Sequence, residues 1–124
     1  MTGKELIAAA IGLIDETDTT SYEASALPKI NLVLAECFDL NNRRREYAEK
    51  EPLTDIPVIT SVDDNITYET DLLYRVLPLG LICRLFVGED NIPVLSMYKQ
   101  EYEYAIRTSD RYPAVSTYAL EIGG

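Results

Sequence analysis

The sequence predicts an all-α protein: a four-helix bundle with kinked helices, a short loop or β-hairpin between the second and third helices, and an extended C-terminal tail. Apolar residues recur at spacings of three and four along four segments, the period of helices that share a core. Helix-start signals precede the first two segments. Prolines and β-branched residues interrupt the pattern between positions 51 and 67. We expect a helical domain over residues 1–110 and an extended arm over residues 111–124.

The first helix is predicted to start after Thr2, because Thr2 and Glu5 have the spacing of a capping box. It should end near Asp15, where the polar run DETDTTS favours turns. Asp15, Glu16 and Asp18 suggest a cation site, but this run lacks the glycine and the distal glutamate of a calcium loop. We therefore expect no metal here.

The second helix is predicted to run from Thr20 to Lys50, since Thr20 and Glu23 repeat the capping-box spacing. One apolar seam follows, formed by Ala26, Ile30, Val33, Cys37 and Leu40. Pro28 should kink this helix, because the seam keeps its phase across it; the alternative is that the helix begins there. The basic run 43–45 should complement the helix dipole and hold nearby acids, with phosphate contact as the alternative.

The segment 51–67 is predicted to be a loop with a possible small hairpin. Pro52 and Pro57 disfavour helix, and PVIT and NITY are short β-branched runs. Asp63 and Asp64 form an acidic pair, but no histidine or second acid is predictably close to them. We therefore expect a solvated turn rather than a catalytic pair.

The third helix, predicted over residues 69–87, is apolar on nearly all sides. Its two arginines, Arg75 and Arg84, point to opposite sides, so no continuous polar face remains. Such a helix must be covered on nearly all sides, and we expect neighbouring subunits to supply part of the cover. Pro78 should bend the helix, and Gly80 removes a side chain where another backbone could come close.

The fourth helix, which ends near Arg107, should be amphipathic, with Leu95, Tyr98, Tyr102, Ala105 and Ile106 on one face. Tyrosine is common at the edge of a core and at protein interfaces. We expect a subunit interface that includes Arg75, Arg84, Tyr98 and Tyr102. Farther on, Tyr118, Leu120 and Ile122 alternate with other residues as in a strand without an obvious partner in its own chain, and edge addition to another protein would satisfy its backbone.

The sequence lacks the residues that common catalytic, metal-binding and phosphate-binding sites require. The chain has no histidine, so the common nucleophile arrangements lack their base and the usual zinc sites lack ligands. No phosphate-binding glycine motif is present. Cys37 and Cys83 lie on apolar stripes without a CxxC, which indicates reduced core residues. We expect no enzyme, no cofactor and no metal.

The net charge and the hydropathy of the chain argue against nucleic acid and membrane as binding partners. A formal net charge of −10 disfavours tight nucleic-acid binding. The chain has no run of about 20 apolar residues and no signal-peptide pattern, so we expect an intracellular protein without a membrane span.

Three segments carry a family resemblance: YEASALPKINLVLAECFDLNN in an early helix, then IPVITSVDDNITYE, then LLYRVLPLGLICRLFVGEDNIPVLSMYKQEYEYAI. Together they resemble the small helical head-tail connector, or adaptor, proteins of tailed bacteriophages and prophages. An LP-aromatic-GL segment, a short acidic turn and a tyrosine-bearing last helix recur in such proteins. Here LPLGL has Leu79 where an aromatic residue is usual. The resemblance covers residues 22–106.

The resemblance implies a virion protein of the neck, made in the host cytoplasm and placed at the head-tail junction. Its partners would be copies of itself in a ring, typically dodecameric, the portal protein above, and a tail or stopper protein below. DNA would pass through the channel without specific binding, because an acidic lining lets it slide. Portal docking is assigned to the C-terminal arm, through Val115, Tyr118, Leu120 and Ile122.

Three alternatives remain open from the sequence. A tail-completion or tail-terminator subunit would usually carry more strand than this sequence predicts. An acidic inhibitor that mimics DNA would array carboxylates along one face, whereas the acids here are scattered through loops and helix ends. An unspecialised helical regulator is the third alternative.

Overall fold

The computed structural model describes residues 1–87 and 92–108, and over these ranges the protein is all-α, as predicted. The described residues form five α-helices, with a 3₁₀ turn before the second and a π-helical turn before the fourth. In chain order the elements are α1 (Gly3–Gly12), η1 (Thr20–Tyr22), α2 (Glu23–Glu36), α3 (Phe38–Tyr47), η2 (Leu72–Val76), α4 (Leu77–Leu85) and α5 (Val94–Arg107). None of these helices is long and apolar enough to cross a membrane.

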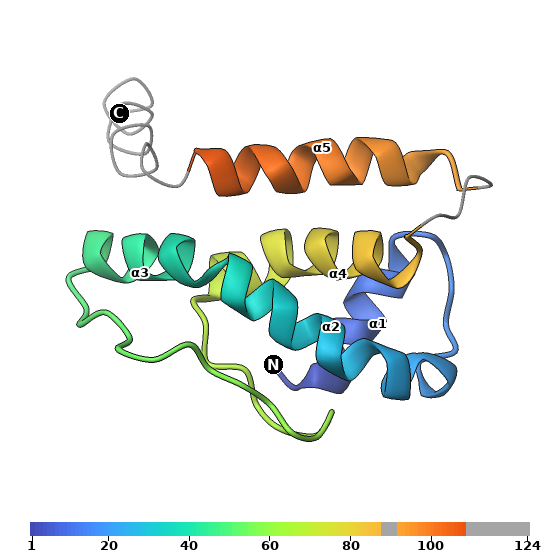
Figure 1. Cartoon of the computed structure of the whole chain (residues 1–124), viewed down its shortest axis with the longest axis horizontal. Helices are drawn as coiled ribbons and strands as arrows, with labels where there is room; N and C mark the ends of the chain where they lie inside the picture. The colour runs from blue at the N-terminus through green and yellow to red at the C-terminus, as the bar shows by residue number, and fades with distance from the viewer. Residues whose placement is uncertain (88–91, 109–124) are drawn as a thin grey trace.

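The helix α4 lies at the centre of the molecule (Figure 1). The helices α1 and α2 pack on one side of it, and α5 lies along another side as an outer layer. Most of the core forms where α1, α2, η2 and α4 meet. Its fully buried members include Leu6, Ile7, Ile11, Ile30, Val33, Leu34, Leu72, Leu77, Leu81 and Ile82.

The first helix starts where the sequence predicts and ends three residues before the predicted end near Asp15. The Glu5 amide donates to Thr2 Oγ1 over 3.2 Å, and the Thr2 amide donates to Glu5 Oε1 over 2.9 Å, which completes the capping box. The helix ends at Gly12, and Asp15 then takes a left-handed φ of 61°. An aspartate tolerates that conformation better than most residues do, and the chain reverses toward α2 there.

The second predicted helix differs from the structure at two points. Thr20–Tyr22 form a 3₁₀ turn, and no side chain caps the start of α2, so the predicted capping box at Thr20 is wrong. The helix does run through Pro28, but it breaks at Cys37, where φ is −94° and ψ is 5°. The five seam residues lie before, at and after this break, and all of them are buried. Because the seam keeps its phase, the periodicity carries no sign of the interruption.

Residues 48–69 form a loop rather than the alternative hairpin. Among the described residues the β-type pairing is a single isolated bridge, between Thr2 and Asn65. Asparagine side chains supply the loop's backbone partners instead. Asn31 bonds both the amide and the carbonyl of Ile59, at 2.9 and 3.0 Å, and Asn42 does the same for Leu53, at 2.8 and 3.0 Å.

The third predicted helix forms as η2 followed by α4. The π-helical turn directly precedes Pro78, which lacks the amide that an α-helix would pair with the Tyr74 carbonyl. Much of the cover of this helix comes from its own chain, and cover of the rest by neighbouring subunits stays a prediction, since Tyr74 is 66% exposed. Leu72, Leu77 and Ile82 are fully buried within the chain itself, because α1 and α2 cover one side of the helix and α5 covers another.

The predicted portal-docking residues Val115, Tyr118, Leu120 and Ile122 lie outside the described residues, as does the predicted arm over residues 111–124.

Candidate functional site

The contact between α4 and α5 is built around Gly80. A Cβ atom placed on Gly80 would lie 2.6 Å from Cζ of Tyr102, closer than real atoms approach. The glycine therefore leaves a slot in α4 that the tyrosine ring fills. Tyr102 is 7% exposed although it lies on the outermost helix. The close approach predicted at Gly80 is therefore made by the side chain of Tyr102 rather than by another backbone.

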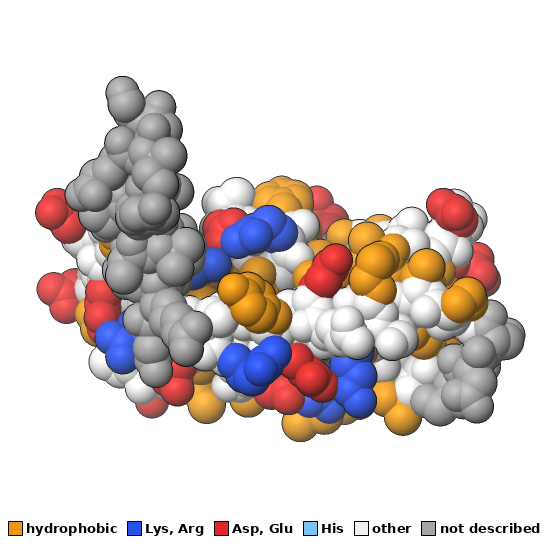
Figure 2. Space-filling view, turned by 90° about the horizontal axis from the view of Figure 1, so that it is seen from above, with side chains coloured by type: hydrophobic (Ala, Val, Ile, Leu, Met, Phe, Trp, Pro, Cys, Tyr) orange, Lys and Arg blue, Asp and Glu red, His pale blue; other side chains and the backbone are white. Residues whose placement is uncertain are grey.

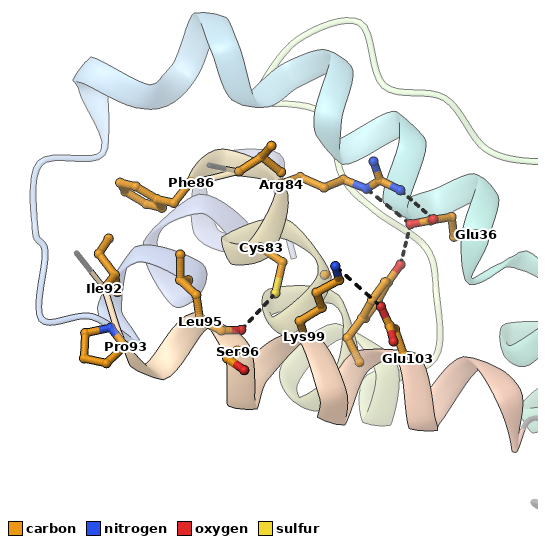
Figure 3. Close-up of a pocket in the computed structure, with 13 residues that line it drawn as sticks. Glu36, Cys83, Arg84, Phe86, Ile92, Pro93, Leu95, Ser96, Lys99 and Glu103 are labelled. Carbon is orange, nitrogen blue, oxygen red and sulfur yellow. Dashed lines mark hydrogen bonds and ion pairs between the residues drawn. The ribbon is translucent and has the colours of Figure 1, made fainter. Parts of the chain in front are cut away.

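The Tyr102 hydroxyl reaches a carboxylate that joins three helices. It donates to Glu36 Oε1 of α2 over 2.8 Å. Arg84 of α4 donates to the same carboxylate through Nε, over 3.2 Å, and pairs with its second oxygen through Nη2. Figure 3 shows the Arg84 side chain extended along the upper edge of the site toward Glu36. The Tyr102 oxygen also lies 3.6 Å from the buried Cys37 Sγ.

Burial and hydrogen bonds act on the ionisation of this cluster in opposite directions. Burial raises the pKa of the Glu36 carboxyl, but the bonds from Arg84 and Tyr102 outweigh it, so the net pKa is lowered. The bond to Glu36 raises the pKa of Arg84. Burial raises the pKa of Tyr102 and moves that of Cys37 to about 12. At neutral pH the cluster thus holds one ion pair, a neutral phenol and a neutral thiol.

A cavity of about 530 Å³ opens beside this cluster, between α4 and α5. Cys83, Phe86 and Leu95 give it apolar walls, while Glu36, Arg84, Lys99 and Glu103 place two carboxylates and two cations at its edge. Each cation has an acidic neighbour, since Lys99 Nζ lies 4.0 Å from Glu103 Oε1. The lining therefore offers apolar contact without a surplus of either charge.

The cysteine that lines the cavity is not in its reactive form. Burial raises the pKa of the Cys83 thiol, so it is protonated at neutral pH, and the thiolate is the form that reacts. Among residues 1–87 and 92–108, no group of three acidic or cysteine side chains could hold a metal ion, and this includes the run of Asp15, Glu16 and Asp18.

The residues predicted for a subunit interface fall into two places. Arg84, Tyr98 and Tyr102 all hold α5 or its neighbours within the same chain, and the Tyr98 hydroxyl donates to the Leu13 carbonyl over 3.1 Å. Arg75 stands apart on η2, where its side chain is 68% exposed and pairs with Asp71. Their role between subunits stays a prediction.

The basic run at the end of α3 serves the fold. Arg44 is buried, and its Nε donates to Asp71 Oδ2 over 2.7 Å. Arg45 Nε donates to the Glu51 carbonyl over 2.6 Å, and its Nη1 lies 3.6 Å from Glu69. Burial raises the pKa of the Asp71 carboxyl, but bonds from Arg75 and Arg44 reverse this and lower it. These contacts agree with the prediction that the run holds nearby acids.

In the loop, Asp64 of the acidic pair stabilises a turn, and Asp63 is exposed. Asp64 Oδ2 accepts from the backbone amides of Thr60 and Ser61 at 2.9 and 3.0 Å, and these bonds lower the pKa of its carboxyl. Asp63 is exposed and lies 3.8 Å from Lys4. Asp63 and Asp64 therefore have separate structural partners.

Several large apolar side chains are exposed on the surface of the described residues. Figure 2 views the α5 side, where hydrophobic side chains are interspersed with acidic and basic ones. Met97 and Tyr104 of α5 are 48% and 62% exposed, and Tyr74 of η2 is 66% exposed. Elsewhere Leu32 of α2 and Val58 of the loop are 52% and 67% exposed. Exposed apolar residues of this size are candidates for contact with other chains.

Glu36, Asn31 and Asn42 make structural contacts that could not be predicted from the sequence. Glu36 lies 66 positions before Tyr102 and 48 before Arg84, so no local pattern connects them. The one available signal was a carboxylate next to Cys37 on the apolar seam. Asn31 and Asn42 carry no sequence signal, because a lone asparagine on a helix is usually solvated.

Comparisons with known proteins add no relative: no family model matches the chain, and neither curated proteins nor solved structures give a match.

Proposed function

We propose that this chain is a structural virion protein, a head-tail connector that forms a ring beneath the portal and extends the DNA channel toward the tail. This role is inferred from the resemblance of residues 22–106 to connector proteins. The ring would consist of copies of this chain, with the portal protein above and a tail or stopper protein below.

One contact supports this proposal most directly. The LPLGL segment and the tyrosine-bearing last helix are separate pieces of the resemblance, and they pack on each other through Gly80 and Tyr102. Leu79 departs from the usual aromatic residue, but it lies beside this contact rather than in it, and it is only partly buried. The two recurring pieces thus form one packing unit.

Exposed apolar residues on different elements are candidates for the interfaces of a ring. A ring is closed by heterologous interfaces, so each subunit needs two different patches that meet around the circle. Leu32 and Val58 lie on α2 and the loop, whereas Tyr74, Met97 and Tyr104 lie on η2 and α5. Arg75 is exposed beside Tyr74, which suits its predicted interface role.

Acidic side chains favour a channel component over a DNA mimic. A mimic needs carboxylates that are free to meet a basic partner. Glu36, Glu69 and Asp71 instead pair with arginine or lysine side chains of their own chain. The remaining negative charge would repel DNA enough for it to slide.

Co-purification with the portal protein of the same phage tests the proposal. The tagged portal should retain the chain. Replacement of Tyr118, Leu120 and Ile122 together by serine should abolish retention, because these alternate residues are the ones assigned to docking.

The matched control changes the intervening positions, with Ala119→Ser and Glu121→Ser together, and should bind as the natural chain does. Far-ultraviolet circular dichroism should show an unchanged helical content for both variants. If the variant with three serines still binds portal, the docking assignment is refuted. If the natural chain does not bind portal, the connector role is refuted.

A further inference from the structure

The outermost helix buries fewer of its residues than α1, α2 and α4 do. Of the α5 residues, all of which are described, only Tyr102 is buried. Leu95, Tyr98, Ala105 and Ile106 are partly buried against the core. By contrast, α1 alone buries five residues. In Figure 1, α5 lies above α4, whereas most of the core forms below it, where α1, α2, η2 and α4 meet.

Two tyrosine hydroxyls provide the polar attachment of α5. Tyr98 donates to the Leu13 carbonyl at the end of α1, and Tyr102 donates to Glu36 on α2. The second bond is the stronger kind, because its acceptor is a carboxylate that Arg84 keeps charged. The same ring fills the Gly80 slot, so apolar and polar attachment coincide at one side chain.

We propose that α5 is a latch helix: it undocks from α4 and redocks as one cooperative unit while α1, α2, η2 and α4 stay folded, and the bond between Tyr102 and Glu36 holds it closed. Proteins open in such sub-global units where an element has few buried apolar contacts. Undocking uncovers the Gly80 slot and Cys83, whose Sγ lies 4.0 Å from the Leu95 carbonyl. This inference does not depend on the connector role.

Native-state hydrogen exchange of the full chain, followed by mass spectrometry in low concentrations of urea, tests the latch. Amides of α5 should exchange through an opening that depends weakly on urea, because little surface is exposed. Amides of α1 and α2 should exchange only through global unfolding. If α5 and α2 exchange through the same opening at every urea concentration, the latch is refuted.

The variant Tyr102→Phe tests the role of the hydroxyl. It keeps the ring and removes the bond to Glu36, so α5 amides should exchange about tenfold faster, which corresponds to ~1.4 kcal/mol. Labelling of the partly buried Cys83 thiol should also accelerate, while exchange in α1 and α2 stays unchanged.

The matched control is Tyr104→Phe, which removes a hydroxyl from an exposed tyrosine on the same helix. It should change neither exchange nor thiol labelling. The proposal is wrong if Tyr102→Phe leaves α5 exchange unchanged, or if it accelerates exchange in α1, α2 and α5 equally.

Discussion

Replacing Gly80 by alanine should destabilise the protein, although alanine is the better helix former. The added Cβ would lie 2.6 Å from Cζ of Tyr102. Relief requires a shift of the α4 backbone or of the ring, and the ring is held by the bond from its hydroxyl to Glu36. Overpacking costs about 1–3 kcal/mol, and the upper part of that range, about 2–3 kcal/mol, applies here because three ring atoms of Tyr102 would lie within 3.0 Å of the added Cβ. The gain in helix propensity returns about 1 kcal/mol. We therefore expect a net loss of about 1–2 kcal/mol.

Gly12→Ala provides a control of opposite sign. Gly12 is the last residue of α1, and a Cβ there would meet no atom within 4 Å. Only the propensity term remains, so this variant should be stabilised by up to about 1 kcal/mol.

Urea unfolding followed by circular dichroism measures both variants. Gly80→Ala should lower the midpoint and reduce Tm by roughly 4–8 °C, whereas Gly12→Ala should raise both. A Gly80→Ala protein as stable as the natural one would show that Tyr102 does not fill the slot, and the assignment of α5 packing would be refuted.

Two further predictions concern Glu36 and Asn31. Because the folded pKa of Glu36 is lowered from an ordinary value of 4.5, its contribution to stability is complete above that value and is lost as pH falls through the lower folded pKa; Glu36→Gln should reduce this acid dependence in urea titrations from pH 7 to pH 3, and an unchanged slope would contradict the role of the ion pair. Asn31→Ala should cost about 1–3 kcal/mol in the same assay, because it leaves the Ile59 amide and carbonyl without their partners. Asn65→Ala, which removes an exposed bond to the N-terminal amine, should cost clearly less, and equal losses would show that Asn31 does not anchor the loop.

Local features of the fold could be predicted from the sequence because they depend on neighbours along the chain. The capping box of Thr2 and Glu5 formed as predicted, since its bonds span three residues. The inward face of α5 was predicted from periodicity, and Lys99, Glu101 and Glu103 are exposed on its other face. The apolar seam of α2 and α3 is buried as its periodicity predicted, whereas of the inward face of α5 only Tyr102 is buried and the other members are partly buried.

The features that the sequence could not reveal depend on distant partners. The break at Cys37 is invisible because the apolar seam continues through it. The all-round apolar character of the third helix predicts burial, but it cannot tell cover by α1, α2 and α5 from cover by another subunit. The Glu36 cluster joins residues up to 66 positions apart, and only the folded chain brings them together.

The connector role itself is tested most directly by the mass of the assembly that this chain forms with its portal. Native mass spectrometry of the purified complex should give one defined species that contains a fixed whole number of copies of this chain per portal ring. A mixture that shows only free portal and free chain, at concentrations well above those used for co-purification, would contradict the proposed ring.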